Sequence, residues 1–335
     1  MKIGIMGQGY VGTAVRSTFE KYYDVKTYDK YQKEKTNSDI KGLLKSSDII
    51  FVCVPTPMNP DGSCDTSIVE EVIETLNSQY SIMRLTYKKV IAIKSTIPPG
   101  TTDKLQKKYS NLGIVFNPEF LTEANFIDDF KNQNRIIIGG DRPYSTIVKQ
   151  VYSKVFPNTP IIKTGSKTAE MVKYFTNTFL ATKVSFANEM CQICETLGID
   201  YDKVVEYSMY DKRIGTSHLS VPGPDGKKGF GGSCFPKDIN AIMSVAEDLS
   251  LDPMVLKAVW DRNLTVRPEK DWEELKGRAV SENTIMGYSD KVKSGIERVQ
   301  YTKKEIKLNR EIEKKIAESE KVKQVKKDDE WELKA

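Results

Sequence analysis

The first 165 residues alternate short, β-branched apolar runs with amphipathic stretches long enough to form helices. Strands that are buried on both faces of a parallel sheet read as continuous apolar runs, so this alternation predicts a doubly wound, Rossmann-like α/β domain. We expect buried parallel strands at residues 2–6, 25–28, 48–54, 90–94, 113–116, 135–138 and 160–162.

From residue 168 to residue 197 the pattern changes to apolar side chains spaced three and four apart, with no proline or glycine. Apolar residues on more than one face, including Leu180 and Ile193, exceed what a single sheet could cover. We therefore expect one long helix, the spine of an all-α central domain at 166–265 and the contact of a homodimer. Residues 266–335 are expected to form a Lys/Glu-rich tail, helical or disordered.

Composition excludes several classes of chemistry. The single histidine, His218, argues against a His-rich zinc site, and we assign no metal. No apolar run reaches the length of a membrane span and the start has no signal-peptide pattern, so a cytoplasmic location with no membrane contact is expected. Residues 289–335 hold 14 Lys+Arg and 11 Asp+Glu, and their interleaving does not indicate nucleic-acid binding.

A glycine fingerprint follows the first expected strand, in the run Gly7-Gln-Gly9-Tyr-Val-Gly12. The first glycine permits a tight turn, the second lets a pyrophosphate approach, and the third allows close packing of helix on strand. Asp29 ends the next strand, 22 residues after Gly7, where a carboxylate would bind the adenosine ribose and repel a 2′-phosphate. The sequence therefore predicts a dinucleotide site that prefers NAD to NADP.

A second glycine-rich run, at residues 229–238, contains Cys234 directly before Phe235 and Pro236. Proline suits the first helical position, and a thiol at a helix N-terminus is expected to have a lowered pKa. Asp238 lies one turn further on, near enough to share a site. Spacing alone leaves two interpretations open, a reactive nucleophile and an inert buried cysteine.

The other cysteines suggest packing or exposure. Five cysteines without a secretion signal argue against a disulfide framework. We expect Cys53 to be buried in a strand, Cys64 to be exposed after a turn, and Cys191 and Cys194 to pack inside the long helix. His218 is expected to be a loop residue with no proton-transfer role.

Further motifs occur in order over about residues 1–265, and together with the glycine runs they resemble the UDP-glucose/GDP-mannose dehydrogenase family. The runs are Cys53-Val-Pro-Thr-Pro57, Lys94-Ser-Thr96, Asn117-Pro-Glu-Phe-Leu-Thr-Glu123, Lys173 with Asn177, Arg213-Ile-Gly215 and Gly-Phe-Gly-Gly-Ser-Cys234-Phe-Pro-Lys-Asp238. The resemblance favours the nucleophile interpretation of Cys234.

The resemblance implies oxidation of the C6 alcohol of UDP-glucose, or a related UDP- or GDP-hexose, to a carboxylate, a step of polysaccharide biosynthesis. Two NAD would be consumed while a cysteine holds the intermediate, first as a thiohemiacetal and then as a thioester. By family correspondence Cys234 is the nucleophile, Lys173 the general base or oxyanion stabiliser, and Asn177 a second hydrogen-bond donor. Asp238 would orient Lys173 and water.

The resemblance also assigns residues around this centre. Thr96 and Glu119 would hold a catalytic water and assist thioester hydrolysis, and Arg213 would reach the substrate of the partner subunit. The expected cofactor contacts are Gly7, Gly9, Tyr10, Val11, Gly12, Asp29, Thr56, Thr96, Glu123 and Lys237. The expected substrate contacts are Glu119, Phe120, Leu121, Lys173, Asn177, Arg213 and Gly231.

The sequence departs from the family after the central helices. Residues 276–280 resemble the first strand of the family's third, Rossmann-like domain, and the pattern is lost from Ser281 onward. We expect the nucleotide half of the substrate to be held by the first two domains and the partner subunit, or by a separate protein that the tail recruits. Two other functions stay open: a non-catalytic NAD-binding assembly subunit, and a one-step sugar-acid or hydroxyacid dehydrogenase.

Overall fold

The structure is a computed structural model that describes residues 1–282, and the rest of the expected tail lies outside the described residues. Within this part the first domain contains one sheet in the order β2-β1-β3-β4-β5-β6-β7. The strands are β1 (Lys2–Met6), β2 (Asp24–Tyr28), β3 (Ile49–Val52), β4 (Val90–Ile93), β5 (Gly113–Phe116), β6 (Ile136–Gly139) and β7 (Ile161–Thr164).

The predicted α/β fold is confirmed, with two corrections to the sheet. Strands β5 and β6 are antiparallel and pair at Phe116 and Gly139, whereas the other neighbouring strands are parallel. Strands β2 and β7 are not fully buried, because they form the two edges of the sheet: β2 has one buried residue, and the residues of β7 are half-buried or exposed.

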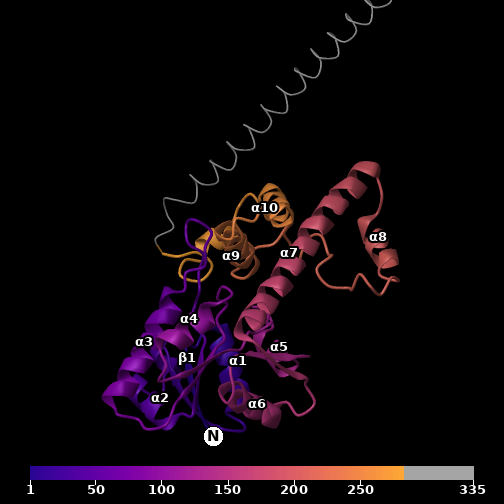
Figure 1. Ribbon diagram of the computed structural model, residues 1–335. Coiled ribbons are helices and arrows are strands. Elements are labelled where there is room, and N and C mark those ends of the chain that lie inside the picture. The colour runs from indigo at the N-terminus through magenta and orange to yellow at the C-terminus, as the bar shows by residue number, and fades with distance from the viewer. Residues whose placement is uncertain (283–335) are drawn as a thin grey trace, which may run out of the picture. The chain divides into compact units, whose positions relative to one another are not determined.

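Helices cover both faces of the sheet (Figure 1). Alternate side chains of a strand point to opposite faces, so Ile49 and Phe51 join one apolar core while Ile50 and Val52 join the other. The first core is closed by α1 (Tyr10–Phe19), α5 (Phe126–Lys131) and α6 (Tyr144–Val155). The second is closed by α2 (Ile40–Ser46), α3 (Ser67–Ile82) and α4 (Thr101–Lys108).

The predicted long helix is present as α7 (Ser166–Leu197), which leaves the sheet domain and becomes the spine of the helical part (Figure 1). It ends where Gly198 adopts a left-handed conformation, with φ 68°, that favours glycine. The helical part also contains α8 (Tyr201–Ser208), α9 (Phe235–Asp248) and α10 (Met254–Val266). None of the helices within residues 1–282 is both long and apolar enough to cross a membrane.

Residues 266–282, which we had grouped with the tail, pack against the rest of the described chain. Trp272, in the short 3₁₀ turn η2 (Asp271–Glu274), is fully buried and its ring lies 5.2 Å from that of Trp260. Residues 275–282, which we call the strap, then reach the loop after β3. There Met58 N donates to Ala279 O at 2.9 Å, and Ser281 N donates to Met58 O at 2.9 Å.

A buried carboxylate docks α7 on the sheet domain. Glu170 accepts hydrogen bonds from Gly100 N at 2.6 Å and from Thr102 N and Oγ1 at 2.8 and 2.6 Å. Gly100 and Thr102 lie at the start of α4, where backbone N–H groups have no partner within the helix. Glu170, a residue of α7, thus caps the N-terminus of α4.

We predict that Glu170→Ala destabilises the protein by about 3 kcal/mol, because it leaves buried donors without an acceptor. Urea unfolding at one protein concentration measures the change. The matched control is Glu71→Ala, which removes an exposed ion pair with Lys30 at 3.8 Å and should cost less than about 1 kcal/mol. Equal losses in the two variants would contradict the capping role.

Candidate functional site

The turn between β1 and α1 has room for a dinucleotide phosphate. Gly7 has φ +91°, and a Cβ there would overlap the carbonyl group of Cys53. A Cβ on Gly12 would overlap the carbonyl oxygen of Gly7. Gly9 precedes the first residue of α1, and the space beside it is open, so a phosphate can approach the helix N-terminus. Gly7 and Gly12 are thus required by close backbone contacts, and the approach of a pyrophosphate at Gly9 stays a prediction.

Asp29 lies at the end of β2, next to this turn. Its Oδ2 accepts from Gln8 N at 2.6 Å, and its Oδ1 accepts from Tyr31 N and Gln32 N at 2.8 Å. Burial raises the pKa of the Asp29 carboxyl, but the hydrogen bonds from these three backbone groups and the charge of Lys35 hold it below its usual value. The resulting negative charge is the feature expected to repel a 2′-phosphate.

Three further predicted cofactor contacts lie around the turn. Tyr10 is the first residue of α1, and its ring meets that of Phe126 edge-on at 5.1 Å. Val11 packs against the core beneath α1. Thr56 is buried in the loop after β3, which begins at the Cys53 carbonyl that Gly7 approaches. The structure thus places Tyr10 and Val11 at the turn and Thr56 in the adjoining loop.

Lys173 of α7 is buried beside Glu119, which follows β5. Its Nζ donates to the Glu119 backbone oxygen at 2.8 Å and lies 3.3 Å from Glu119 Oε1. Glu119 Oε2 is buried and accepts no hydrogen bond from the described residues. The Phe120 ring lies 5.5 Å from Lys173 Nζ, whereas Leu121 packs against the core of the sheet domain.

Asn177 lies one turn after Lys173 and contacts Asp238. Its Nδ2 donates to Asp238 Oδ2 at 2.5 Å, and Lys237 Nζ donates to Asp238 Oδ1. Asp238 therefore pairs with Asn177 and Lys237 in this structure, and the carboxylate that holds Lys173 is Glu119. The expected orientation of Lys173 by Asp238 is corrected accordingly, and the charge of Lys237, expected at the cofactor, is engaged by Asp238.

Cys234 precedes α9, which begins at Phe235, so Pro236 takes the second helical position and not the first. Burial raises the pKa of the Cys234 thiol above its usual value, while the charges of Lys173 and Lys237 lower it and those of Asp238 and Glu119 raise it. The expected lowering of this pKa is therefore wrong, because desolvation and the two carboxylates outweigh the cations.

Thr96 is buried after β4, and its backbone oxygen accepts from Cys64 Sγ at 3.7 Å. Cys64 is thus not a freely exposed residue. Burial raises the pKa of its thiol to about 11, with the nearby charges of Lys237 lowering it and Asp238 raising it. A second protonated thiol therefore lies close to the Lys237–Asp238 pair.

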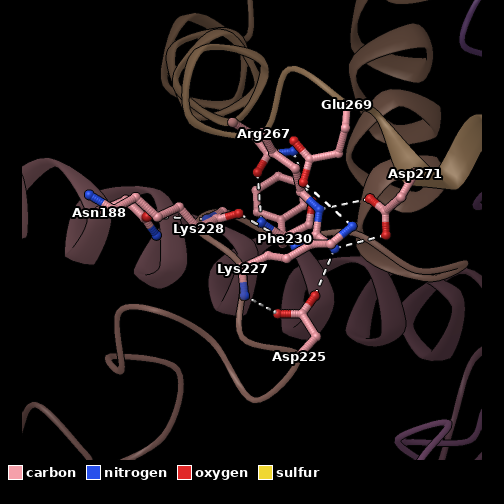
Figure 2. A network of polar contacts seen from close by, with 10 residues as sticks. Asn188, Asp225, Lys227, Lys228, Phe230, Arg267, Glu269 and Asp271 are labelled. Carbon is pink, nitrogen blue, oxygen red and sulfur yellow. Dashed lines mark hydrogen bonds and ion pairs between the residues drawn. The ribbon is translucent and has the colours of Figure 1, made fainter.

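A polar network holds the loop that leads to Cys234 (Figure 2). The guanidinium of Arg267 is buried; it donates to Asp271 through Nε and Nη2 at 2.7 and 2.8 Å and to Asp225 Oδ2 at 2.7 Å. Asn263 of α10 exchanges two hydrogen bonds with the backbone of Phe230, at 2.7 and 2.9 Å. These contacts fix the loop from both sides.

Two of the predicted substrate contacts, Gly231 and Arg213, lie in different surroundings. A Cβ on Gly231 would lie within 2.5 Å of Arg267 Nη2 and Asp271 Oδ1, so packing against this ion pair requires the glycine. The side chain of Arg213 is 90% exposed, follows α8, and pairs with Asp211 at 2.5 Å. Among the described residues its guanidinium therefore pairs with Asp211, and its reach to the substrate of a partner subunit stays a prediction.

Four polar residues around the site had no assigned role. Ser233 Oγ donates to Glu123 Oε1, and Arg278 Nη2 donates to Glu123 Oε2 at 2.9 Å. Arg267 holds the loop described above.

The fourth residue is Lys94, whose Nζ donates to Asn117 O at 3.0 Å; burial lowers the pKa of Lys94 to about 8. The position of Lys94 at the end of an apolar strand could have identified it as a residue of the site. No local sequence pattern indicates a role for Arg278.

Comparison with known proteins gives two matching family models. Residues 22–156 match the NAD binding domain of the UDP-glucose/GDP-mannose dehydrogenase family, and residues 167–265 match its central domain. Both matches lie in the part of the chain that carries the predicted motifs.

Individual relatives carry UDP-glucose dehydrogenase names. The UDP-glucose 6-dehydrogenase of Rickettsia bellii (strain RML369-C) is 36% identical over 235 residues, which are 68% of this chain and 52% of that protein. The UDP-glucose 6-dehydrogenase of Haloferax volcanii is 31% identical over 322 residues, 83% of this chain and 73% of that protein. The solved structure of a UDP-glucose dehydrogenase from Pyrobaculum islandicum has a TM-score of 0.72 and 30% identity, over 79% of this chain and 68% of that chain. The chain spans about half the length of the Rickettsia bellii relative.

We predict that Cys234 is alkylated slowly at pH 7 and that its rate rises with pH, with a midpoint above the ordinary thiol value of about 8.5. The reason is that a raised pKa leaves the thiol protonated until higher pH. Lys173→Met should move the midpoint further up, because the charge of Lys173 lowers this pKa. Mass spectrometry of the Cys234 peptide after timed iodoacetamide treatment measures the rate. A midpoint below 8 without ligands would contradict the prediction.

Proposed function

Because the chain belongs to the UDP-glucose/GDP-mannose dehydrogenase family, we propose that it oxidises the C6 alcohol of a nucleotide sugar to a carboxylate, with UDP-glucose as the first candidate substrate. The observation that carries this proposal is the grouping of Cys234 with Lys173, Lys237, Asp238 and Glu119, whose charges all act on the thiol. A glycine turn with open space beside Gly9 lies in the sheet domain, which also contributes Glu119.

Bound NAD would supply the hydride acceptor for both oxidation steps. Lys173 and Asn177 are four residues apart on α7, so their donors face the same side and are suited to stabilise one substrate oxygen. Thiolate attack by Cys234 on the aldehyde carbon would form a thiohemiacetal, which keeps the aldehyde from leaving between the two steps.

Hydrolysis of the resulting thioester requires a water and a base. Glu119 Oε2 is buried and accepts no hydrogen bond from the described residues, so it is suited to take a proton from water. Thr96, also buried, is proposed to help hold that water. Glu123 and Lys237 remain proposed cofactor contacts.

We propose that the working form is a homodimer built on α7. Apolar side chains on this helix face solvent, and the rings of Phe175 and Phe179 stack with centroids 6.3 Å apart. An exposed apolar stripe of this kind marks an interaction surface. Arg213 would then reach the site of the partner subunit. A protein partner for the tail is proposed as well.

Activity is tested by mixing the full chain with NAD and a panel of UDP-glucose, GDP-mannose and UDP-N-acetylhexosamines. We expect two NADH per sugar oxidised, and no net carboxylate from Cys234→Ser, because serine forms no thioester. Cys194→Ser, a buried cysteine of α7 in the packed helical core, is the matched control and should keep activity. Full carboxylate formation by Cys234→Ser would refute the thioester mechanism, and tight NAD binding without turnover would favour the assembly-subunit hypothesis.

The dimer is tested by sedimentation equilibrium. Phe179→Glu places a charge on the exposed face of α7, where the native side chain is 56% exposed, and should shift the protein to monomer. Ile82→Glu, at a residue 68% exposed at the end of α3, is the control and should leave the mass unchanged. A Phe179→Glu variant with unchanged mass would rule out this surface as the dimer contact.

A further inference from the structure

The strap carries an arginine to the edge of the dinucleotide turn. Arg278 lies between Gly277 and the buried residues Ala279 and Val280. Its backbone is held on both sides, since Gly277 N donates to Val280 O at 2.7 Å and Met58 N donates to Ala279 O at 2.9 Å. The guanidinium lies 4.9 Å from the centroid of the Tyr10 ring, over the residue that opens α1.

The same guanidinium links the turn to the thiol. Arg278 Nη2 donates to Glu123 Oε2 at 2.9 Å, and Glu123 also accepts from Ser233, the neighbour of Cys234. A dinucleotide that places its phosphates at the turn and its reactive ring near Cys234 must cross this line of residues. The side chains of Arg278 and Glu123 are 39% and 34% exposed, so the pair borders solvent and a ligand can reach it.

From these contacts we propose that Arg278 is a cofactor-binding residue that donates to the diphosphate of the bound dinucleotide. This inference rests on the dinucleotide site of the proposed function. An arginine presents five donors in a planar fork that matches phosphate oxygens. In the described part of the chain Nε and Nη1 of Arg278 have no protein acceptor, so they are available while Nη2 keeps Glu123.

The charge of Arg278 would complement the positive end of α1 at this turn. The N-terminus of α1 offers N–H groups and a partial positive charge to a ligand that carries two negative charges. Lys35 also lies nearby, with its Nζ 3.3 Å from Gln8 O, but on the side of the turn next to Asp29. Arg278 supplies the cation on the side of Tyr10 and Glu123.

The experiment measures dissociation constants of NADH and of ADP-ribose by calorimetry with the full chain. ADP-ribose keeps the diphosphate and lacks the nicotinamide. Arg278→Ala should weaken both ligands by about tenfold to a hundredfold, because one or two charge-assisted hydrogen bonds are lost. Arg278→Lys, which keeps the charge and loses the fork, should weaken both several-fold. The control Arg16→Ala removes an arginine that pairs with Glu20 at 3.3 Å at the other end of α1 and should change neither.

Other results would overturn this inference, the proposed function, or both. Unchanged ADP-ribose binding in Arg278→Ala would overturn it, and so would loss of NADH binding alone, since that places Arg278 at the nicotinamide. If Arg278→Ala fails to fold, unchanged affinity in Arg278→Lys overturns it instead. Absence of sugar turnover with Arg278-dependent ADP-ribose binding would sink the proposed function and leave this inference standing. An unmodified protein that binds neither ligand would overturn both.

Discussion

The site depends on how one helix docks on the sheet domain. Glu170 of α7 caps the start of α4 with three hydrogen bonds, and this fixes both the position and the rotation of α7. Lys173 and Asn177 follow at three and seven residues, so they lie on the face that Glu170 directs toward the sheet domain. Their partners, Glu119 and Asp238, come from a strand end and from the start of α9.

Paired charges set the state of the thiol. Lys173 pairs with Glu119, and Lys237 pairs with Asp238, so each cation that would stabilise a Cys234 thiolate has a carboxylate beside it. Burial is therefore the largest influence on the Cys234 thiol, and it raises the pKa of that thiol. A protonated thiol resists oxidation, which suits the role of nucleophile that is proposed for Cys234. Substrate oxygens that engage either carboxylate or cation would alter this balance.

The sequence predicted those features that local pattern determines. Apolar runs located the strands, the glycine spacing located the phosphate turn, and the uninterrupted three-and-four spacing located α7. It could not predict which charges meet, because that depends on how distant segments pack. Asp238 was expected at Lys173, yet the structure gives that position to Glu119, 54 residues away in the chain. The antiparallel contact of β5 with β6 likewise follows from the connection between them and not from the apolar pattern of either strand.

The segment after α10 joins the two halves of the site. Arg267 at its start pairs with Asp225 and so holds the loop that ends in Cys234, while Arg278 near its end pairs with Glu123 and lies on Tyr10. Glu123 accepts from both Arg278 and Ser233, so this one carboxylate connects the arginine that lies on Tyr10 with the residue next to the thiol.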